Sequence, residues 1–101
     1  MAMLILKVTY HVKSRMVNEF MTMLTDADIE EKVRVEEGCI KYYYTSHLEN
    51  DTVILTECWE SKEAQQKHLN QPYMSVVKAL KEKYVLSTDV SQETESTFEE
   101  E

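Results

Sequence analysis

Residues 57–74, ECWESKEAQQKHLNQPYM, hold most of the signals that decide the fold of this chain. The stretch starts at the end of an alternating apolar segment, which predicts the last part of a β-strand. Ser61 predicts the start of a short helix over 62–69, and Pro72 predicts the first position of another helix that runs to about residue 83. Because the only tryptophan and the only proline of the chain lie here, we expect the stretch to line one side of any pocket.

Two alternating segments that lead into this stretch predict a β-hairpin. Residues 39–48 and 52–60 alternate between apolar and polar side chains, and the residues between them are typical of a turn. With Asn50 and Asp51 as the two turn residues, Tyr42 lies opposite Trp59 and Cys39 lies opposite position 62. In this register the inward face consists of Ile40, Tyr42, Tyr44, Leu48, Val53, Leu55, Glu57 and Trp59.

The segments on either side of the hairpin complete the order β-α-β-β-α-β. Residues 3–12 and 85–91 predict the first and the last strand in chain order. Between the first strand and the hairpin, Ser14 is a suitable helix cap, and Gly38 is expected to end the helical pattern, which has a break near 26–28. The apolar stripe of this helix consists of Val17, Phe20, Met21, Leu24, Ala27, Ile29 and Val33.

This order predicts one α+β domain with a ferredoxin-like fold over residues 1–91, in which an antiparallel sheet carries its helices on one face. Residues 92–101 contain five glutamates and predict an acidic tail that is mobile or loosely docked. The outward face of the hairpin, which includes Tyr43 and Ile54, is too apolar to be simply solvated. We therefore expect a second copy of the chain to cover it.

Composition excludes several classes of protein. A chain with a single glycine cannot build the glycine-rich loops that cradle nucleotides. A formal net charge of −8 disfavours binding to nucleic acid. The longest apolar run, residues 1–6, is too short to cross a bilayer, so a cytoplasmic protein that binds no membrane is expected. Cys39 and Cys58 are expected to be reduced, and the three histidines show no spacing typical of a metal site.

The sequence resembles the antibiotic biosynthesis monooxygenase (ABM) domains over nearly all of its length. The resemblance is carried by ECWESKEAQQKHLNQPYM at 57–74 and by EEGCIKYYY at 36–44, and it is closest to the small quinol monooxygenase and autoinducer-processing branches. Tyr73 stands where that pattern often has histidine. The haem-degrading branch fits less well, because Lys7, His68 and Lys78 occupy the positions of its asparagine, tryptophan and histidine.

The resemblance implies a dimeric α/β barrel, in which the sheets of two protomers pack face to face. It also implies a pocket in each protomer between sheet and helices. In that pocket an electron-rich aromatic, such as a small quinol or polyhydroxy-aromatic, is oxidised by dioxygen without flavin, haem or metal. The expected partners are thus a second copy of the chain in a homodimer, the aromatic or quinone-like substrate and dioxygen. No cofactor is expected.

Two residues are candidates for proton transfer. His68 is one, because histidine titrates near neutral pH, but a histidine at the end of a helix can also serve only to satisfy the last carbonyls. Glu57 is the other, because a carboxylate on an inward face must be paired or protonated; a register error of one residue would move it to the surface. Glu57 would either orient His68 or act as the base itself.

The remaining candidates would form the walls of a substrate pocket. Trp59 could stack on a flat ring or could simply close the core. The other expected wall residues are Tyr42, Tyr44, Tyr73, Phe20 and Leu24. The sequence also leaves two other functions open, because an isomerase of a small hydroxy-ketone needs the same base, and a dimeric module that only binds an aromatic ligand needs the same walls.

Overall fold

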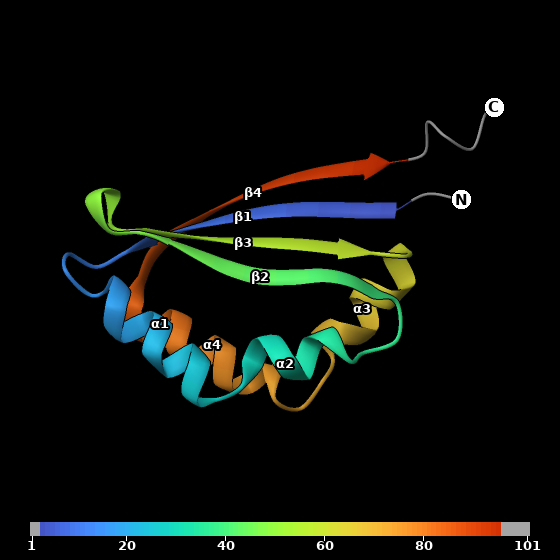
Figure 1. Cartoon of the computed structure of the whole chain (residues 1–101), viewed down its shortest axis with the longest axis horizontal. Helices are drawn as coiled ribbons and strands as arrows, with labels where there is room; N and C mark the ends of the chain where they lie inside the picture. The colour runs from blue at the N-terminus through green and yellow to red at the C-terminus, as the bar shows by residue number, and fades with distance from the viewer. Residues whose placement is uncertain (1–2, 96–101) are drawn as a thin grey trace.

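The computed structural model describes residues 3–95, which form a four-stranded antiparallel sheet with all helices on one face (Figure 1). The strand order β2-β3-β1-β4 is that of a ferredoxin-like fold, so the predicted α+β class is confirmed. The elements are β1 (Met3–Val12), α1 (Val17–Asp26), α2 (Ile29–Arg34), β2 (Cys39–His47), the 3₁₀ turn η1 (Leu48–Asn50), β3 (Thr52–Trp59), α3 (Lys62–Leu69), α4 (Met74–Tyr84) and β4 (Val85–Glu95).

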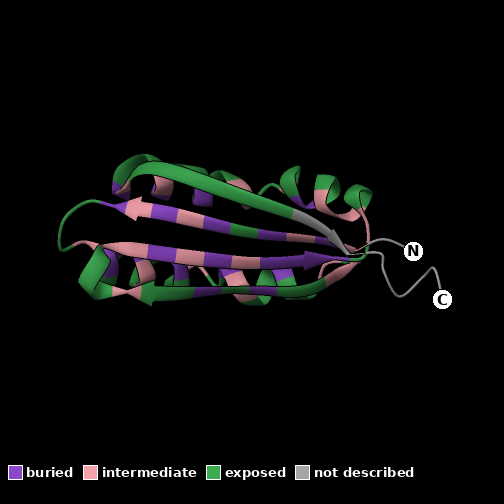
Figure 2. Cartoon of the chain, turned by 90° about the horizontal axis from the view of Figure 1, so that it is seen from above, coloured by how far each residue is buried: buried purple, intermediate pink, exposed green. Residues whose placement is uncertain are grey.

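The core lies between the sheet and the helices. Along β1 every second residue from Leu4 to Val12 is buried, and the two central strands show this alternation clearly (Figure 2). Phe20 of α1 and Val33 of α2 are fully buried against this face, as their positions in the predicted apolar stripe require. Trp59 is also 0% exposed, which makes it the largest side chain buried in the core.

The β2–β3 register differs from the predicted one by two residues. Tyr42 lies opposite Glu57 and not opposite Trp59, while Tyr44 lies opposite Leu55. The cause is the turn, because η1 and the left-handed Asp51 (φ 52°) take up residues that were expected to pair. A shift of two preserves which face each side chain occupies, but Leu48, now in the turn and 58% exposed, leaves the inward face.

A β-bulge at the start of β2 corrects two further expectations. The register shifts between Cys39 and Lys41, so Ile40 is displaced from the inward face and is 44% exposed. Cys39 pairs with Trp59, not with position 62, and therefore lies beside Cys58 on the ladder. Both cysteines are free thiols, as expected.

The predicted helix ends were right in two places and wrong in three. The break before α2 is present at Asp28, which has a left-handed backbone (φ 55°), and Ser61 caps α3 by accepting a hydrogen bond from the Ala64 N–H. Ser14 does not cap α1, whose N-cap is Met16. Helix α2 ends at Arg34, four residues before Gly38, and α4 begins at Met74, two residues after Pro72.

Strand β4 is longer than predicted and runs through Glu95. Residues 92–95 pair with residues 3–6 of β1, so the first four residues assigned to the acidic tail belong to the sheet. The predicted boundary at residue 91 falls inside this strand, and residues 96–101 lie outside the described range.

Gly38 permits the closest approach between the sheet and α3. Its backbone is left-handed (φ +86°), and a Cβ placed on it would lie 2.5 Å from the Cβ of Ala64. Its carbonyl also accepts a hydrogen bond from the Glu60 N–H at 2.8 Å, which holds the entry to β2 beside the exit of β3. A side chain at position 38 would therefore force α3 away from the sheet.

We expect Gly38→Ala to lower the free energy of unfolding by about 2 to 4 kcal/mol, the sum of left-handed backbone strain and overpacking. Urea denaturation at fixed protein concentration measures it. The double variant Gly38→Ala/Ala64→Gly separates the two causes, because it removes the clash with the Ala64 methyl and keeps the backbone strain. We expect the double variant to be more stable, by about 1 kcal/mol or more, than the sum of the two single substitutions predicts. A Gly38→Ala variant within about 0.5 kcal/mol of the native protein would show that α3 is free to shift.

Candidate functional site

A partly open cavity of about 200 Å³ lies between the sheet and the junction of α3 and α4, and the exposed Leu69 and Val90 are among the residues that line it. We call it the inner cavity. Its walls combine apolar side chains with a small number of polar groups, which is the usual composition of a ligand site. The lining residues that carry polar groups are Tyr10, Tyr42, Glu57, Gln65, His68, Lys81 and Thr88.

His68, in the last turn of α3, is held in one orientation. It is 1% exposed, and its ring lies 4.9 Å from the Trp59 ring at an interplanar angle of 30°. The Tyr42 ring meets it edge-on at 5.4 Å. Its Nδ1 lies 3.1 Å from Oε2 of Glu36, so the imidazole is fixed by stacking on its faces and by a carboxylate at one nitrogen.

Glu36 is a residue of the candidate site that the sequence did not predict. It lies between α2 and β2, its side chain is 10% exposed, and its Oε2 also accepts a hydrogen bond from the Tyr73 hydroxyl. A carboxylate at Nδ1 favours the tautomer with the proton on that nitrogen, which leaves Nε2 as the basic atom of His68. Tyr73 thus reaches the site through Glu36 and does not line the inner cavity.

Glu57 is buried on the inward face, as predicted, and is 6% exposed. The indole N–H of Trp59 donates to its Oε1 at 2.9 Å. Burial raises the pKa of Glu57, and the Trp59 hydrogen bond and the nearby His68 and Lys81 oppose that rise. Within the described part of the chain Glu57 makes no hydrogen bond to His68, so Glu36 is the residue that orients the imidazole.

The tyrosines of the site are neutral hydrogen-bonding groups. The hydroxyls of Tyr42 and Tyr44 lie 3.0 Å apart, and both residues are buried. Burial raises the pKa of Tyr42, Tyr44 and Tyr10, so each keeps its proton at neutral pH. Tyr10, which was not among the predicted site residues, lines the inner cavity beside Tyr42.

Phe20 and Leu24, both predicted as pocket walls, lie elsewhere. Phe20 packs against Tyr10 at 6.1 Å and against Tyr84 at 5.7 Å, outside the residues that line the inner cavity. Leu24 lines a second cavity, of about 300 Å³, between α1, α2 and β2.

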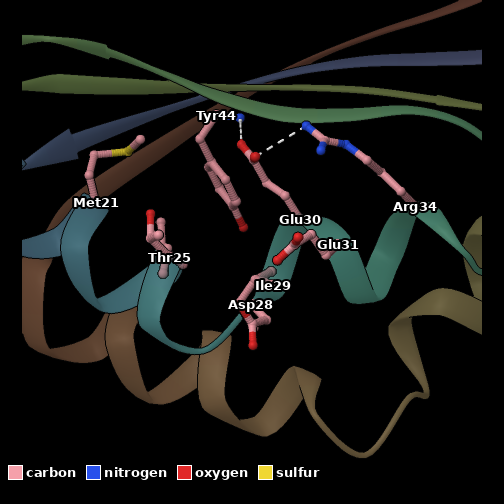
Figure 3. A pocket seen from close by; sticks show the side chains of 9 residues that line it. Met21, Thr25, Asp28, Ile29, Glu30, Glu31, Arg34 and Tyr44 are labelled. Atoms are coloured by element: carbon pink, nitrogen blue, oxygen red, sulfur yellow. Dashed lines mark hydrogen bonds and ion pairs between the residues drawn. The ribbon is translucent and has the colours of Figure 1, made fainter.

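Figure 3 shows this second cavity, into which the Tyr44 ring extends. Its central carboxylate, Glu30, is already engaged, because it accepts from the Tyr44 backbone N–H at 2.7 Å and from Arg34 at 3.1 Å. No histidine is among the described residues that line the second cavity, whereas both His68 and the buried Glu57 line the inner cavity. The inner cavity is therefore the candidate site.

Residues 3–95 contain no candidate metal site and no candidate membrane-spanning helix. Within that range no three His, Cys, Asp or Glu side chains converge in a way that could hold a metal ion. No helix in the same range is long and apolar enough to cross a membrane.

The protein is thus an α+β domain with a ferredoxin-like sheet, and a buried imidazole and a buried carboxylate line a small cavity beneath that sheet. The profile of the antibiotic biosynthesis monooxygenase family matches residues 3–80. The chain belongs to this family.

Solved structures share the fold. A conserved protein from Methanosarcina mazei is 22% identical, with a TM-score of 0.78 and 92% of each chain covered. A protein from Pseudomonas aeruginosa is 17% identical, with a TM-score of 0.80, and 94% of this chain and 95% of that chain are covered. A proposed antibiotic biosynthesis monooxygenase from Deinococcus radiodurans is 22% identical, with a TM-score of 0.72 and 89% of each chain covered. No curated protein matches the sequence significantly.

Glu57 should make stability depend on pH. Because its pKa is higher in the folded protein than in the unfolded chain, ionisation costs folding free energy as the pH rises from about 4.3 through the folded pKa. Glu57→Gln removes that cost and retains an acceptor for the Trp59 indole. We expect the variant and the native protein to have equal stability near pH 4 and the variant to be more stable at pH 8.

Urea denaturation midpoints across this pH range measure the difference in stability between the two proteins. Glu60→Gln is the matched control, because Glu60 lies three residues after Glu57 and is exposed. The control should change stability by less than about 0.5 kcal/mol at every pH. A constant gap between Glu57→Gln and native protein from pH 4 to pH 8 would contradict the assignment of a buried, titrating carboxylate.

Proposed function

We propose that this protein is a cytoplasmic, cofactor-independent monooxygenase that oxidises a small quinol or polyhydroxy-aromatic with dioxygen. The observation that carries the proposal is the Glu36–His68 pair beside the inner cavity. Nδ1 of His68 is occupied by Glu36 at 3.1 Å, so the free nitrogen can act as a base toward a ligand. Family membership makes monooxygenation the reaction to test first.

The first step is removal of a phenolic proton by Nε2 of His68. Glu36 stabilises the imidazolium that forms, because its carboxylate already accepts from Nδ1. The substrate anion is electron-rich and transfers one electron to dioxygen, which gives a substrate radical and superoxide. The apolar walls of the cavity, including Leu55 and Val77, limit the access of water to these species.

The second step joins the two radicals at a ring carbon. The resulting peroxide breaks its O–O bond and loses water, so that one oxygen atom stays in a hydroxylated quinone and the other leaves as water. The substrate supplies all four electrons, and no other reductant is needed. The Tyr42 hydroxyl, which remains protonated because burial raises its pKa, can donate a hydrogen bond to the developing peroxide.

Two alternatives predict different behaviour without oxygen. An isomerase of a small hydroxy-ketone is favoured by the same base and by the second carboxylate, Glu57, beside it; it would turn over anaerobically. A binding module would bind an aromatic ligand and never turn it over. Oxygen dependence therefore separates the three functions.

We expect oxygen consumption above autoxidation when chelator-treated protein meets a panel of quinols and catechols, measured with an oxygen electrode. His68→Ala should lower the rate by about 100-fold or more, because it removes the base. Glu36→Gln should lower it by about tenfold and shift the pH–rate profile, because only the orientation and charge support of His68 change.

The matched control is Glu37→Gln, since Glu37 is the exposed neighbour of Glu36. It should leave the rate unchanged. Equal rates for Glu36→Gln and Glu37→Gln would remove Glu36 from the mechanism, and turnover without oxygen would replace the monooxygenase with the isomerase.

We also propose that the protein is a homodimer that pairs through the outward face of the sheet. No described helix covers this face (Figure 1), and it presents Ile5, Ile54 and Tyr43, the last 41% exposed. Thr56 lies near its centre, paired with Lys7 on one side and Tyr43 on the other. A second copy would bury this surface, as the family resemblance implies.

Light scattering at micromolar concentration should give the mass of a dimer. Thr56→Arg should shift it to a monomer, since a charge would be buried at the centre of the interface. Thr22→Arg, on the exposed face of α1, is the control and should remain dimeric. A native monomer would rule out the pairing.

A further inference from the structure

Lys81 is the one lysine or arginine among the described residues that line the inner cavity. It lies on α4, and its Nζ is 5.7 Å from the centre of the Tyr10 ring. It forms no ion pair with a carboxylate of a described side chain within 4.0 Å. Lys81 is half-buried, and Glu57 is near enough to interact with it electrostatically but does not form an ion pair with it. The ammonium therefore remains available to an anionic ligand at the wall of the cavity.

The polar groups of the inner cavity fall at two ends. Glu57 lies opposite Leu6 of β1, beside Tyr42, whereas Tyr10 is four residues further along the same strand and lies opposite Thr88. At about 3.3 Å per residue, the two ends are separated by roughly 13 Å at the backbone. The side chains converge within this distance, because Glu57 lies close enough to Lys81 and to Tyr10 to interact electrostatically with both. The end opposite Lys81, Tyr10 and Thr88 is therefore marked by His68, which stacks on Trp59 where that residue pairs with Leu4.

The space between the two ends is apolar and small. It is bounded by Val8, Leu55, Val77 and Met74, and the whole cavity measures about 200 Å³. A cavity of about 150 Å³ is sufficient for benzene. The inner cavity thus has room for one aromatic ring and its substituents.

We propose that the substrate is a single-ring dihydroxy-aromatic acid, whose hydroxyls face His68 and whose acidic group binds Lys81. This inference rests on the proposed function and specifies its substrate class. The Lys81 ammonium supplies a charge-assisted hydrogen bond to the acid, and the Thr88 and Tyr10 hydroxyls complete that end of the site. Binding at the far end holds the reacting hydroxyl at the base.

The test measures binding and turnover separately. Calorimetry under nitrogen gives Kd for 3,4-dihydroxybenzoate and for 3,4-dihydroxybenzamide, which has nearly the same shape and no charge. We expect the acid to bind about 10- to 100-fold more tightly, the range for a hydrogen bond to a charged group. A third probe, 1,4-dihydroxy-2-naphthoate, carries the acid on two rings and should bind at least about tenfold more weakly than the single-ring acid.

Lys81→Met should reduce the acid-to-amide ratio to near one while leaving the binding of the amide unchanged. Lys78→Met is the matched control, because Lys78 is exposed on the same helix and does not line the inner cavity. It should retain the native ratio. Equal binding of acid and amide by the native protein, or a ratio that persists in Lys81→Met, would overturn the role of Lys81, and tight binding of the naphthoate would overturn the one-ring limit.

Admission of oxygen then separates this inference from the proposed function. Lys81-dependent binding of the acid with no oxygen consumption would support the ligand class and reject the monooxygenase. Oxygen consumption on neutral quinols with no preference for the acid would support the monooxygenase and reject the ligand class.

Discussion

The site depends on how closely α3 approaches the sheet, and the contact between Gly38 and Ala64 permits that approach. Gly38 and Ala64 meet where any larger side chain would clash. With this contact α3 packs closely on β3, and His68 in the last turn of the helix stacks on Trp59. The same glycine lies two residues after Glu36, so the segment that ends at the close contact also brings the carboxylate to Nδ1. The packing of α3 on the sheet and the pairing of Glu36 with His68 thus depend on the same short segment.

Electrostatics in the inner cavity follow from burial. Glu57, His68, Tyr10 and Tyr42 are removed from water together, and the pKa values of Glu57 and of the two tyrosines rise accordingly. The tyrosines remain donors, while Glu57 is available to hold or accept a proton. The basic nitrogen of His68 is set by Glu36, which comes from outside the sheet. Proton acceptors and a proton donor therefore lie side by side, since Tyr42 packs against His68 and pairs with Glu57 across the ladder.

The fold and half of the site could be predicted from alternation along the strands. Alternation placed Glu57, Trp59 and Tyr42 on one face, and the register error of two residues preserved this because the side-chain period is two. The turn at Leu48 and the bulge at Ile40 could not be predicted, so both residues were assigned to the wrong face. Glu36 could not be found, because its partners, His68 and Tyr73, are 32 and 37 residues away and no local pattern encodes such a contact. Phe20 and Leu24 were correctly placed in the core, but a helical stripe does not reveal which cavity each residue faces.

Strand β4 forms one wall of the inner cavity and is paired only with β1. Two of its side chains that line the cavity, Thr88 and Val90, are exposed. The other walls belong to the three strands and the helices that hold the core. A ligand can therefore reach the cavity past these exposed side chains while β4 stays paired with β1. Access to the site then depends on which side chains β4 presents at positions 88 and 90, and exposed positions can change with little effect on the free energy of unfolding.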